Sequence, residues 1–199
     1  LSAQGDTSFV LLQRGMFQGM SRLEYLDLSN NNLQTIEVGV FAGLRSLGLI
    51  HLWNNKLTTI AKGMFEGLRR LNYMTLDHNR LTSIEVESFV DLKSLSFLNL
   101  ADNDLNSIDV GTFAGLQSLQ KLWLMRNKLT SIANGTFLKL LALTGELYIY
   151  ENKDLVHTSD NITVLRSAWG VPSGCEPGIC LRYGERCVAQ GCPDDGIIG

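Results

Sequence analysis

A single period of 24 residues runs through most of this 199-residue chain, and four residue types keep fixed places within it. The four columns are leucine at Leu23, Leu47, Leu71, Leu95, Leu119 and Leu143; asparagine at Asn31, Asn55, Asn79, Asn103 and Asn127; isoleucine at Ile36, Ile60, Ile84, Ile108 and Ile132; and phenylalanine at Phe17, Phe41, Phe65, Phe89, Phe113 and Phe137. A chain with one strict period of this length folds as a stack of equal turns.

Stacking also explains which residue types recur. One repeat cannot bury its own leucines, but neighbouring turns bury them against each other, with the phenylalanines on the opposite side of the same core. The asparagines follow the predicted strands, where a buried side-chain amide can satisfy backbone groups of adjacent turns. We therefore interpret all four columns as structural and none of them as a functional site.

The segment LEYLDLSNNNLQTIEVGVFAGLRS, from Leu23 to Ser46, carries the pattern L-x-x-L-x-L-x-x-N-x-L-x-x-I-x-x-G-x-F-x-G-L-x-x. It resembles the extracellular, 24-residue form of the leucine-rich repeat family, over about residues 9 to 155 and five full copies. The resemblance implies an α/β solenoid, a right-handed horseshoe in which each repeat adds one short strand to a concave parallel sheet. It also implies a disulfide-bonded C-terminal cap.

The pattern divides the chain into three parts. Residues 1–22 form a degenerate N-terminal partial repeat, and residues 23–155 hold five regular repeats and an irregular one with one extra residue within 143–152 and another within 152–155. Residues 156–199 form a cysteine-rich cap with a helix predicted over 160–170. Because no cysteine-bearing cap precedes the repeats, the first turn must be covered by residues 1–10 or by another chain, or the chain has been trimmed. Coverage by a second copy predicts a homodimer that dissociates when Phe9 or Leu12 carries a charge.

The cysteines indicate the compartment. All four lie in the last 25 residues, at Cys175, Cys180, Cys187 and Cys192. This even cluster predicts two disulfides, with three connectivities open, whereas a four-thiolate zinc site is the alternative that lacks its usual C-x2-C pairs. Glycosylation triplets at Asn134 and Asn161 agree with a secretory route. The sequence therefore predicts an extracellular glycoprotein, secreted or displayed on a cell surface.

Alternation along each predicted strand assigns the positions that point out of the sheet. These positions hold six of the eight Trp and Tyr residues of the chain, and we expect Trp123 and Met125 to face water there. Aromatic side chains with polar neighbours on a rigid sheet are typical anchors of a binding surface, although aromatic residues also favour strands in general. The predicted ligand-binding residues are Tyr25, Asp27, His51, Trp53, Tyr73, Asp77, Phe97, Asn99, Lys121, Trp123, Met125, Arg126, Tyr148 and Tyr150.

Charge limits the class of partner. A formal charge of −3 argues against nucleic acid or an anionic membrane, and no apolar run is long enough to span a bilayer. The binding face is predicted to carry acids on its N-terminal and central part and bases near Trp123, namely Asp27, Asp77 and Asp102 and then Lys121 and Arg126. We expect a protein or carbohydrate partner with a basic group opposite the acids and an acidic or hydroxylated group near Arg126, and neither a metal nor a cofactor.

Catalysis is not predicted. Ser29, His51 and Asp77 lie on successive strands and have the residue types of a hydrolytic triad. An open sheet, however, offers no oxyanion hole and does not exclude water. The sequence predicts a binding protein rather than an enzyme.

The short array and its aromatic-rich sheet look like the variable lymphocyte receptors, which implies immune or pathogen recognition. In those receptors a loop of the C-terminal cap also binds ligand, which here implies parts of residues 171–192. A cell-adhesion or matrix protein of the same fold is the alternative, and a self-associating structural module is a third reading.

Overall fold

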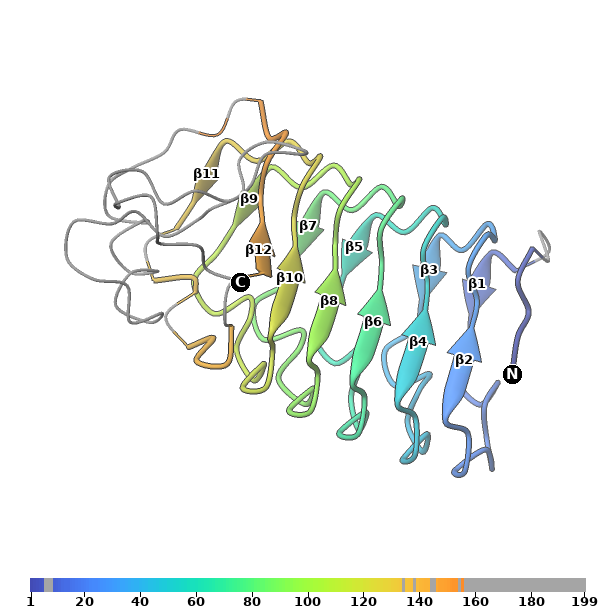
Figure 1. The fold of residues 1–199 in the computed structure, drawn as a ribbon. Coiled ribbons are helices and arrows are strands. Elements are labelled where there is room, and N and C mark those ends of the chain that lie inside the picture. Colours follow the sequence, from blue (N-terminus) through green and yellow to red (C-terminus); the bar gives the residue numbers. More distant parts are fainter. Residues whose placement is uncertain (6–8, 134, 138, 144–145, 154, 156–199) are drawn as a thin grey trace, which may run out of the picture.

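The protein is a curved solenoid of parallel strands (Figure 1), seen in a computed structural model that describes residues 1–5, 9–133, 135–137, 139–143, 146–153 and 155. One three-residue strand per turn enters a six-stranded parallel sheet, in the order β2-β4-β6-β8-β10-β12. Its strands are β2 (Tyr25–Asp27), β4 (Leu49–His51), β6 (Tyr73–Thr75), β8 (Phe97–Asn99), β10 (Lys121–Trp123) and β12 (Glu146–Tyr148). The predicted concave sheet of a leucine-rich repeat horseshoe is confirmed.

The opposite, convex side consists of turns and two-residue strands. These strands are β1 (Leu11–Leu12), β3 (Thr35–Ile36), β5 (Thr59–Ile60), β7 (Ser83–Ile84), β9 (Ser107–Ile108) and β11 (Ser131–Ile132). The described residues contain no helix, so the helical component of the α/β prediction has no counterpart among them. In the same residues there is also no helix with the length and apolarity needed to cross a bilayer.

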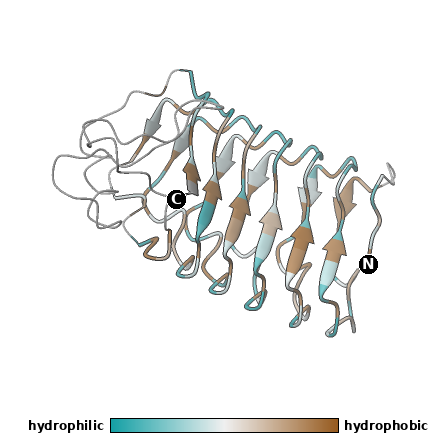
Figure 2. Ribbon diagram, in the orientation of Figure 1, coloured by the Kyte–Doolittle hydropathy of each residue, from teal (hydrophilic) through white to brown (hydrophobic). Residues whose placement is uncertain are grey.

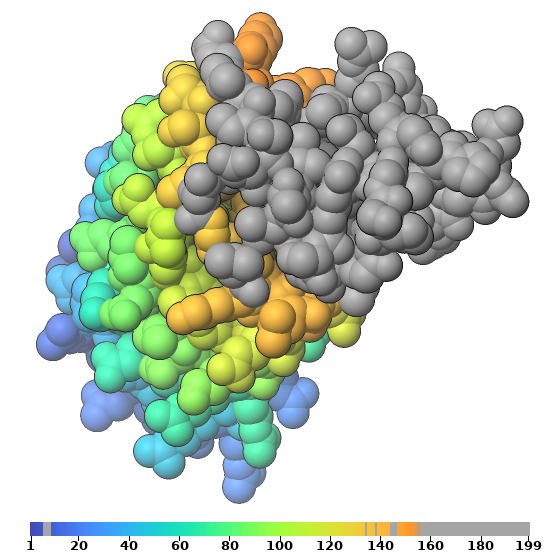
Figure 3. All heavy atoms as spheres, turned by 90° about the vertical axis from the view of Figure 1, so that its left-hand side faces the viewer, coloured from blue at the N-terminus to red at the C-terminus, as the bar shows by residue number. Residues whose placement is uncertain are grey.

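The core lies between the two sides and runs the length of the solenoid. The leucine column is buried apart from the half-buried Leu23, and the phenylalanine rings form one continuous stack with centroids 5.9 to 6.4 Å apart. Viewed along the solenoid, successive turns lie one behind another (Figure 3). Each turn is therefore covered by its two neighbours, which is why a single repeat would not fold alone.

The asparagine column is a ladder of buried hydrogen bonds. Asn55 Nδ2 donates to the carbonyls of Leu28 (2.9 Å) and Leu52 (3.0 Å), while its Oδ1 accepts from the backbone N–H of Leu33 (3.0 Å). The same arrangement repeats at Asn79, Asn103 and Asn127. The predicted structural role of these amides is confirmed.

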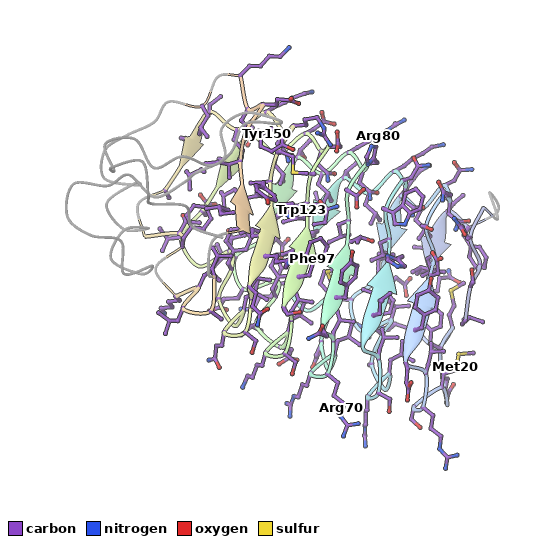
Figure 4. All side chains as sticks on the ribbon, viewed as in Figure 1. Met20, Arg70, Arg80, Phe97, Trp123 and Tyr150 are labelled. Carbon is purple, nitrogen blue, oxygen red and sulfur yellow. The ribbon has the colours of Figure 1, made fainter. Side chains whose placement is uncertain are left out.

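The N-terminal edge of the sheet is covered by residues 1–5. The N–H of Asp27 donates to the carbonyl of Leu1 (2.9 Å), and the N–H of Ala3 donates to the carbonyl of Asp27 (2.9 Å). Leu12 is fully buried, so a charge there would disrupt the core instead of reporting on a dimer as predicted. The exposed apolar side chains at this end are Leu1, Val10, Met16 and Met20 (Met20 is labelled in Figure 4).

The last described turn keeps its place despite its extra residue. Trp123 pairs with Tyr148, which is one residue beyond the regular period, as predicted from the sequence. Asn152 then occupies the next place in the ladder and accepts a hydrogen bond from the N–H of Leu129 (3.1 Å). The predicted helix over 160–170, the four cysteines and the triplet asparagines Asn134 and Asn161 lie outside the described residues.

Candidate functional site

Aromatic rings cross the whole concave face in an unbroken series of contacts, the aromatic ladder. The centroids of neighbouring rings are 4.4 to 6.2 Å apart, and the contacts include edge-on, stacked and tilted ones. In order across the sheet the members are Tyr25, His51, Tyr73, Phe97, Trp123, Tyr148 and Tyr150. Figure 4 labels Phe97, Trp123 and Tyr150 as they follow one another over β8, β10 and the end of β12. The sheet therefore holds these rings at fixed spacing without help from a ligand.

A shallow depression of about 490 Å³, the central pocket, lies over β4, β6 and β8 and the turns that follow them. Its lining combines aromatic, polar and acidic side chains: His51, Trp53, Asn54, Tyr73, Thr75, Asp77, His78 and Asn99. Five of these are predicted site residues, but Asn54, Thr75 and His78 were missed. Their sequence positions beside Trp53, Tyr73 and Asp77, on the same outward surface, were the signal that could have predicted them.

Polar groups of the central pocket are mostly bonded to each other. His51 Nδ1 lies 2.8 Å from the hydroxyl oxygen of Thr75, and His78 Nδ1 lies 2.9 Å from Asp77 Oδ2. Burial, and then the nearby charge of Asp77, raise the pKa of Tyr73, so the phenol stays protonated. The pocket thus keeps one carboxylate close to an aromatic wall.

Asp27 is buried, with 7% of its surface exposed, although the sequence placed it on the accessible face. Its Oδ1 accepts hydrogen bonds from the hydroxyl (2.6 Å) and N–H (3.0 Å) of Ser29, and its Oδ2 accepts from the hydroxyl of Tyr25 (2.9 Å). Burial opposes ionisation, but these bonds outweigh it and lower the pKa of Asp27. Asp27 is therefore a local structural anion, and the prediction that it directly faces a ligand loses support.

Over β10 and β12 the outward side chains bury each other. Met125 (7% exposed) and Tyr150 (8% exposed) form a C-terminal apolar cluster with Ala101, against which Trp123 and Tyr148 pack. The prediction that Met125 faces water is wrong, because its neighbours in this cluster cover it. Trp123 is half-buried, and its Nε1 is buried without a hydrogen-bond partner among the described residues.

Arg126 uses its charge within the protein. Its Nε and Nη2 donate to Asp102 Oδ1 (2.6 Å) and Oδ2 (2.7 Å) in a two-pronged ion pair. The hydrogen bonding to Asp102 is the main cause of a strongly raised pKa for Arg126. An acidic group of a partner would have to compete with Asp102, which the sequence prediction did not foresee.

The residues that resemble a hydrolytic triad have separate partners. Ser29 is fully buried and donates to Asp27, His51 pairs with Thr75, and Asp77 pairs with His78. Among the described residues, no group of three or more His, Cys, Asp or Glu side chains has the arrangement of a metal site. The structure therefore does not join these three side chains into one hydrogen-bonded group.

A family profile described as leucine rich repeat matches residues 5–52, 45–105 and 98–148. The chain belongs to the leucine-rich repeat family. Among curated proteins no sequence matches this repeat protein.

Solved structures show the same fold at 22 to 24% identity. One is the structure of a TLR13–ssRNA13 complex, which shares 23% sequence identity and has a TM-score of 0.58. The match covers 77% of this chain and 25% of the chain in that structure. The Drosophila Toll–Spatzle complex, described as a hub in development and innate immunity, shares 24% over 76% of this chain and 23% of its own (TM-score 0.61). The APL1 leucine-rich repeat domain shares 22% over 70% of this chain and 36% of its own (TM-score 0.63). This repeat protein thus spans between 23% and 36% of the length of these three chains.

The predicted site residues on the six-stranded sheet differ in their exposure to solvent. Tyr25 and Lys121 are exposed, and the half-buried residues are His51, Trp53, Tyr73, Asp77, Trp123, Arg126 and Tyr148. The buried ones are Asp27, Phe97, Asn99, Met125 and Tyr150. The structure therefore brings all fourteen predicted residues onto one face, while it gives only nine of them direct access.

Proposed function

We propose that this leucine-rich repeat protein is an extracellular recognition module, without enzymatic activity, that binds a protein or glycan on its concave face in immune or pathogen recognition. The aromatic ladder carries this proposal. Rings on a rigid sheet lose little conformational freedom on binding, and they offer large contact areas with polar tips.

The convex side offers no comparable surface among the described residues. Its exposed apolar side chains include Val86, Val90 and Val110, which are smaller than the aromatic rings of the concave face, and single exposed apolar residues are common on protein surfaces. Figure 2 shows hydrophobic and hydrophilic residues side by side along the long sheet. A binding face of mixed character favours a partner that presents both apolar and polar groups.

The ligand class is tested by binding of the purified chain to an array of microbial glycans, whole microbes, extracellular host proteins and single-stranded RNA. A Tyr25→Ala/Trp53→Ala variant removes two accessible rings of the concave face. A Val86→Ala/Val110→Ala variant is the matched control, because it removes two exposed apolar side chains from the convex side. We expect microbial binding that is lost in the first variant and kept in the second.

Other outcomes assign other functions. Binding of a host protein through the same residues would replace pathogen recognition by adhesion or a matrix role. The exclusion of nucleic acid rests only on the charge of the chain, and the fold does not support it, because one structure with this fold is a complex with RNA. Equal loss of binding in both variants, or in neither, would overturn the concave face as the site.

Self-association is a second candidate, because Leu1, Val10, Met16 and Met20 expose apolar surface at the first turn. If a second copy covers this surface, light scattering will show a dimer that a Val10→Lys/Met16→Lys variant converts to a monomer. A wild-type monomer at high concentration would rule out the dimer.

A further inference from the structure

The central pocket lies in a part of the concave face without Lys or Arg side chains among the described residues. The outward segments of the first four sheet strands, residues 25–30, 49–54, 73–78 and 97–102, contain three aspartates and no Lys or Arg. Asp27 is buried under its own hydrogen bonds, and Asp102 is neutralised by Arg126. Asp77 is therefore the carboxylate of this region that no described Lys or Arg side chain neutralises, and its described partner is His78.

Asp77 is accessible from the pocket. Its side chain is 16% exposed, and one of its oxygens is bonded to His78. The other oxygen, Oδ1, accepts no hydrogen bond from the described residues and remains available to a donor on a ligand.

Aromatic groups surround this carboxylate. Trp53 and Tyr73 line the same pocket, and Tyr73 is held by a stacked contact with Phe97 (4.4 Å between centroids) and an edge contact with His51 (5.8 Å). A cation gains from the faces of Trp and Tyr rings as well as from an anion, and it gains more where water is partly excluded. Both kinds of group are present here within one depression.

Neutral polar ligands find fewer partners in the same place. The hydroxyl of Thr75 is engaged by His51, the amide nitrogen of Asn54 donates to Asn30 (2.6 Å), and Asn99 Oδ1 accepts from the N–H of Ala101 (3.0 Å). A sugar ring needs several such groups to replace its bonds to water. The pocket is thus better suited to a charged group than to a neutral sugar.

We propose that the central pocket binds the side chain of a lysine or arginine on a protein ligand, with Asp77 as the counter-ion and Trp53 and Tyr73 as the aromatic walls. This assignment rests on the proposed function, since it names the ligand group that the concave face selects. A volume of about 490 Å³ accommodates such a side chain together with part of its backbone.

The test uses the full chain and small probes, so that it does not depend on knowing the ligand. The indole N–H signal of Trp53, assigned with a Trp53→Phe variant, is followed by NMR during titration with Nα-acetyl-lysine methylamide or its arginine counterpart. The norleucine counterpart is the neutral control of similar shape, and N-acetylglucosamine represents a glycan. We expect saturable shifts with the two cationic probes, at a Kd on the order of 1–10 mM, and binding of norleucine weaker by about fivefold or more.

Two variants test whether lysine binding depends on Asp77 itself or on the total negative charge of the protein. Asp77→Asn keeps the shape of the side chain and is expected to weaken lysine binding by about fivefold or more. Asp104→Asn removes a carboxylate that pairs with Lys128 away from the pocket, and it should leave the Kd unchanged. Thermal unfolding of both variants shows whether each is folded as the wild type is.

Each result decides the proposal. Equal affinity for lysine and norleucine, an unchanged Kd in folded Asp77→Asn, or a response to N-acetylglucosamine alone would overturn it. If the ligand array shows binding that needs Trp53 but not Asp77, the proposed function stands and the cation pocket fails. If the probes bind as expected while no array ligand binds, the pocket stands and the proposed function fails.

Discussion

The two halves of the concave face share one backbone arrangement, but their outward side chains are buried by different kinds of contact. Over β2, β4 and β6 the buried outward residues are polar and bonded to neighbours, as Asp27 is to Ser29 and Thr75 is to His51. Over β8, β10 and β12 they are mostly apolar and cover each other, as Met125 and Tyr150 do. Register therefore decides which way a side chain points, while its cross-strand neighbours decide whether a ligand can reach it.

The largest expected effect distinguishes the two tryptophans. Trp123 packs against Phe97 and Tyr148, so Trp123→Ala should lower the free energy of unfolding by about 2–3 kcal/mol. Trp53 has no ring contact among the described residues, and Trp53→Ala should lower it by less than about 1 kcal/mol. Chemical denaturation of both variants checks this, and equal losses would mean that the two halves are packed alike.

The next effect concerns the two aspartates of the turns. Asp102→Asn breaks the two-pronged pair and leaves the half-buried Arg126 without its anion, which should cost about 1–2 kcal/mol. Asp77→Asn loses a single exposed bond to His78 and should cost clearly less. Chemical denaturation at low and at high salt concentration measures the free energy of unfolding of both variants. A loss in Asp102→Asn no larger than that in Asp77→Asn would contradict the structural role of the Arg126 pair.

A pH effect is expected from the N-terminal half. The pKa of Asp27 is lower in the folded protein than its ordinary value of 3.8, so its ionised form stabilises the fold above that value. This contribution is lost as the pH falls below 3.8 through the folded pKa. Asp27→Asn should therefore show a shallower loss of stability between about pH 5 and 2.5 than the wild type, measured by thermal unfolding. Parallel curves would mean that Asp27 ionises alike in both states.

The smallest effect tests what Tyr25 contributes to the N-terminal half. Tyr25→Phe removes the hydroxyl that donates to Asp27 but keeps the ring, which is 40% exposed. We expect a loss of about 0.5 kcal/mol in the free energy of unfolding and nearly unchanged ligand binding. A strong loss of binding would assign the hydroxyl, rather than the ring, to ligand contact.

Sequence periodicity predicted the sheet, its register and the core columns, because these depend on interactions that every turn repeats. It even placed an extra residue before Tyr148. It did not predict the burial of Met125 and Tyr150 or the pairing of Arg126 with Asp102, because each depends on particular side chains on adjacent strands. The cover provided by residues 1–5 was one of several alternatives, since nothing in their composition marks them as a strand.

The constant spacing of the turns also governs how the solenoid folds and locally unfolds. Contacts join positions about 24 residues apart, so a growing folded segment adds one neighbour at a time and pays a small loop-closure entropy for each addition. Turns with a complete turn on both sides open less often than the turn of β2, whose outer edge is covered only by residues 1–5. Amide hydrogen exchange should accordingly be slowest along β6 and faster along β2. The central pocket would then lie in the part of the described chain that unfolds locally least often.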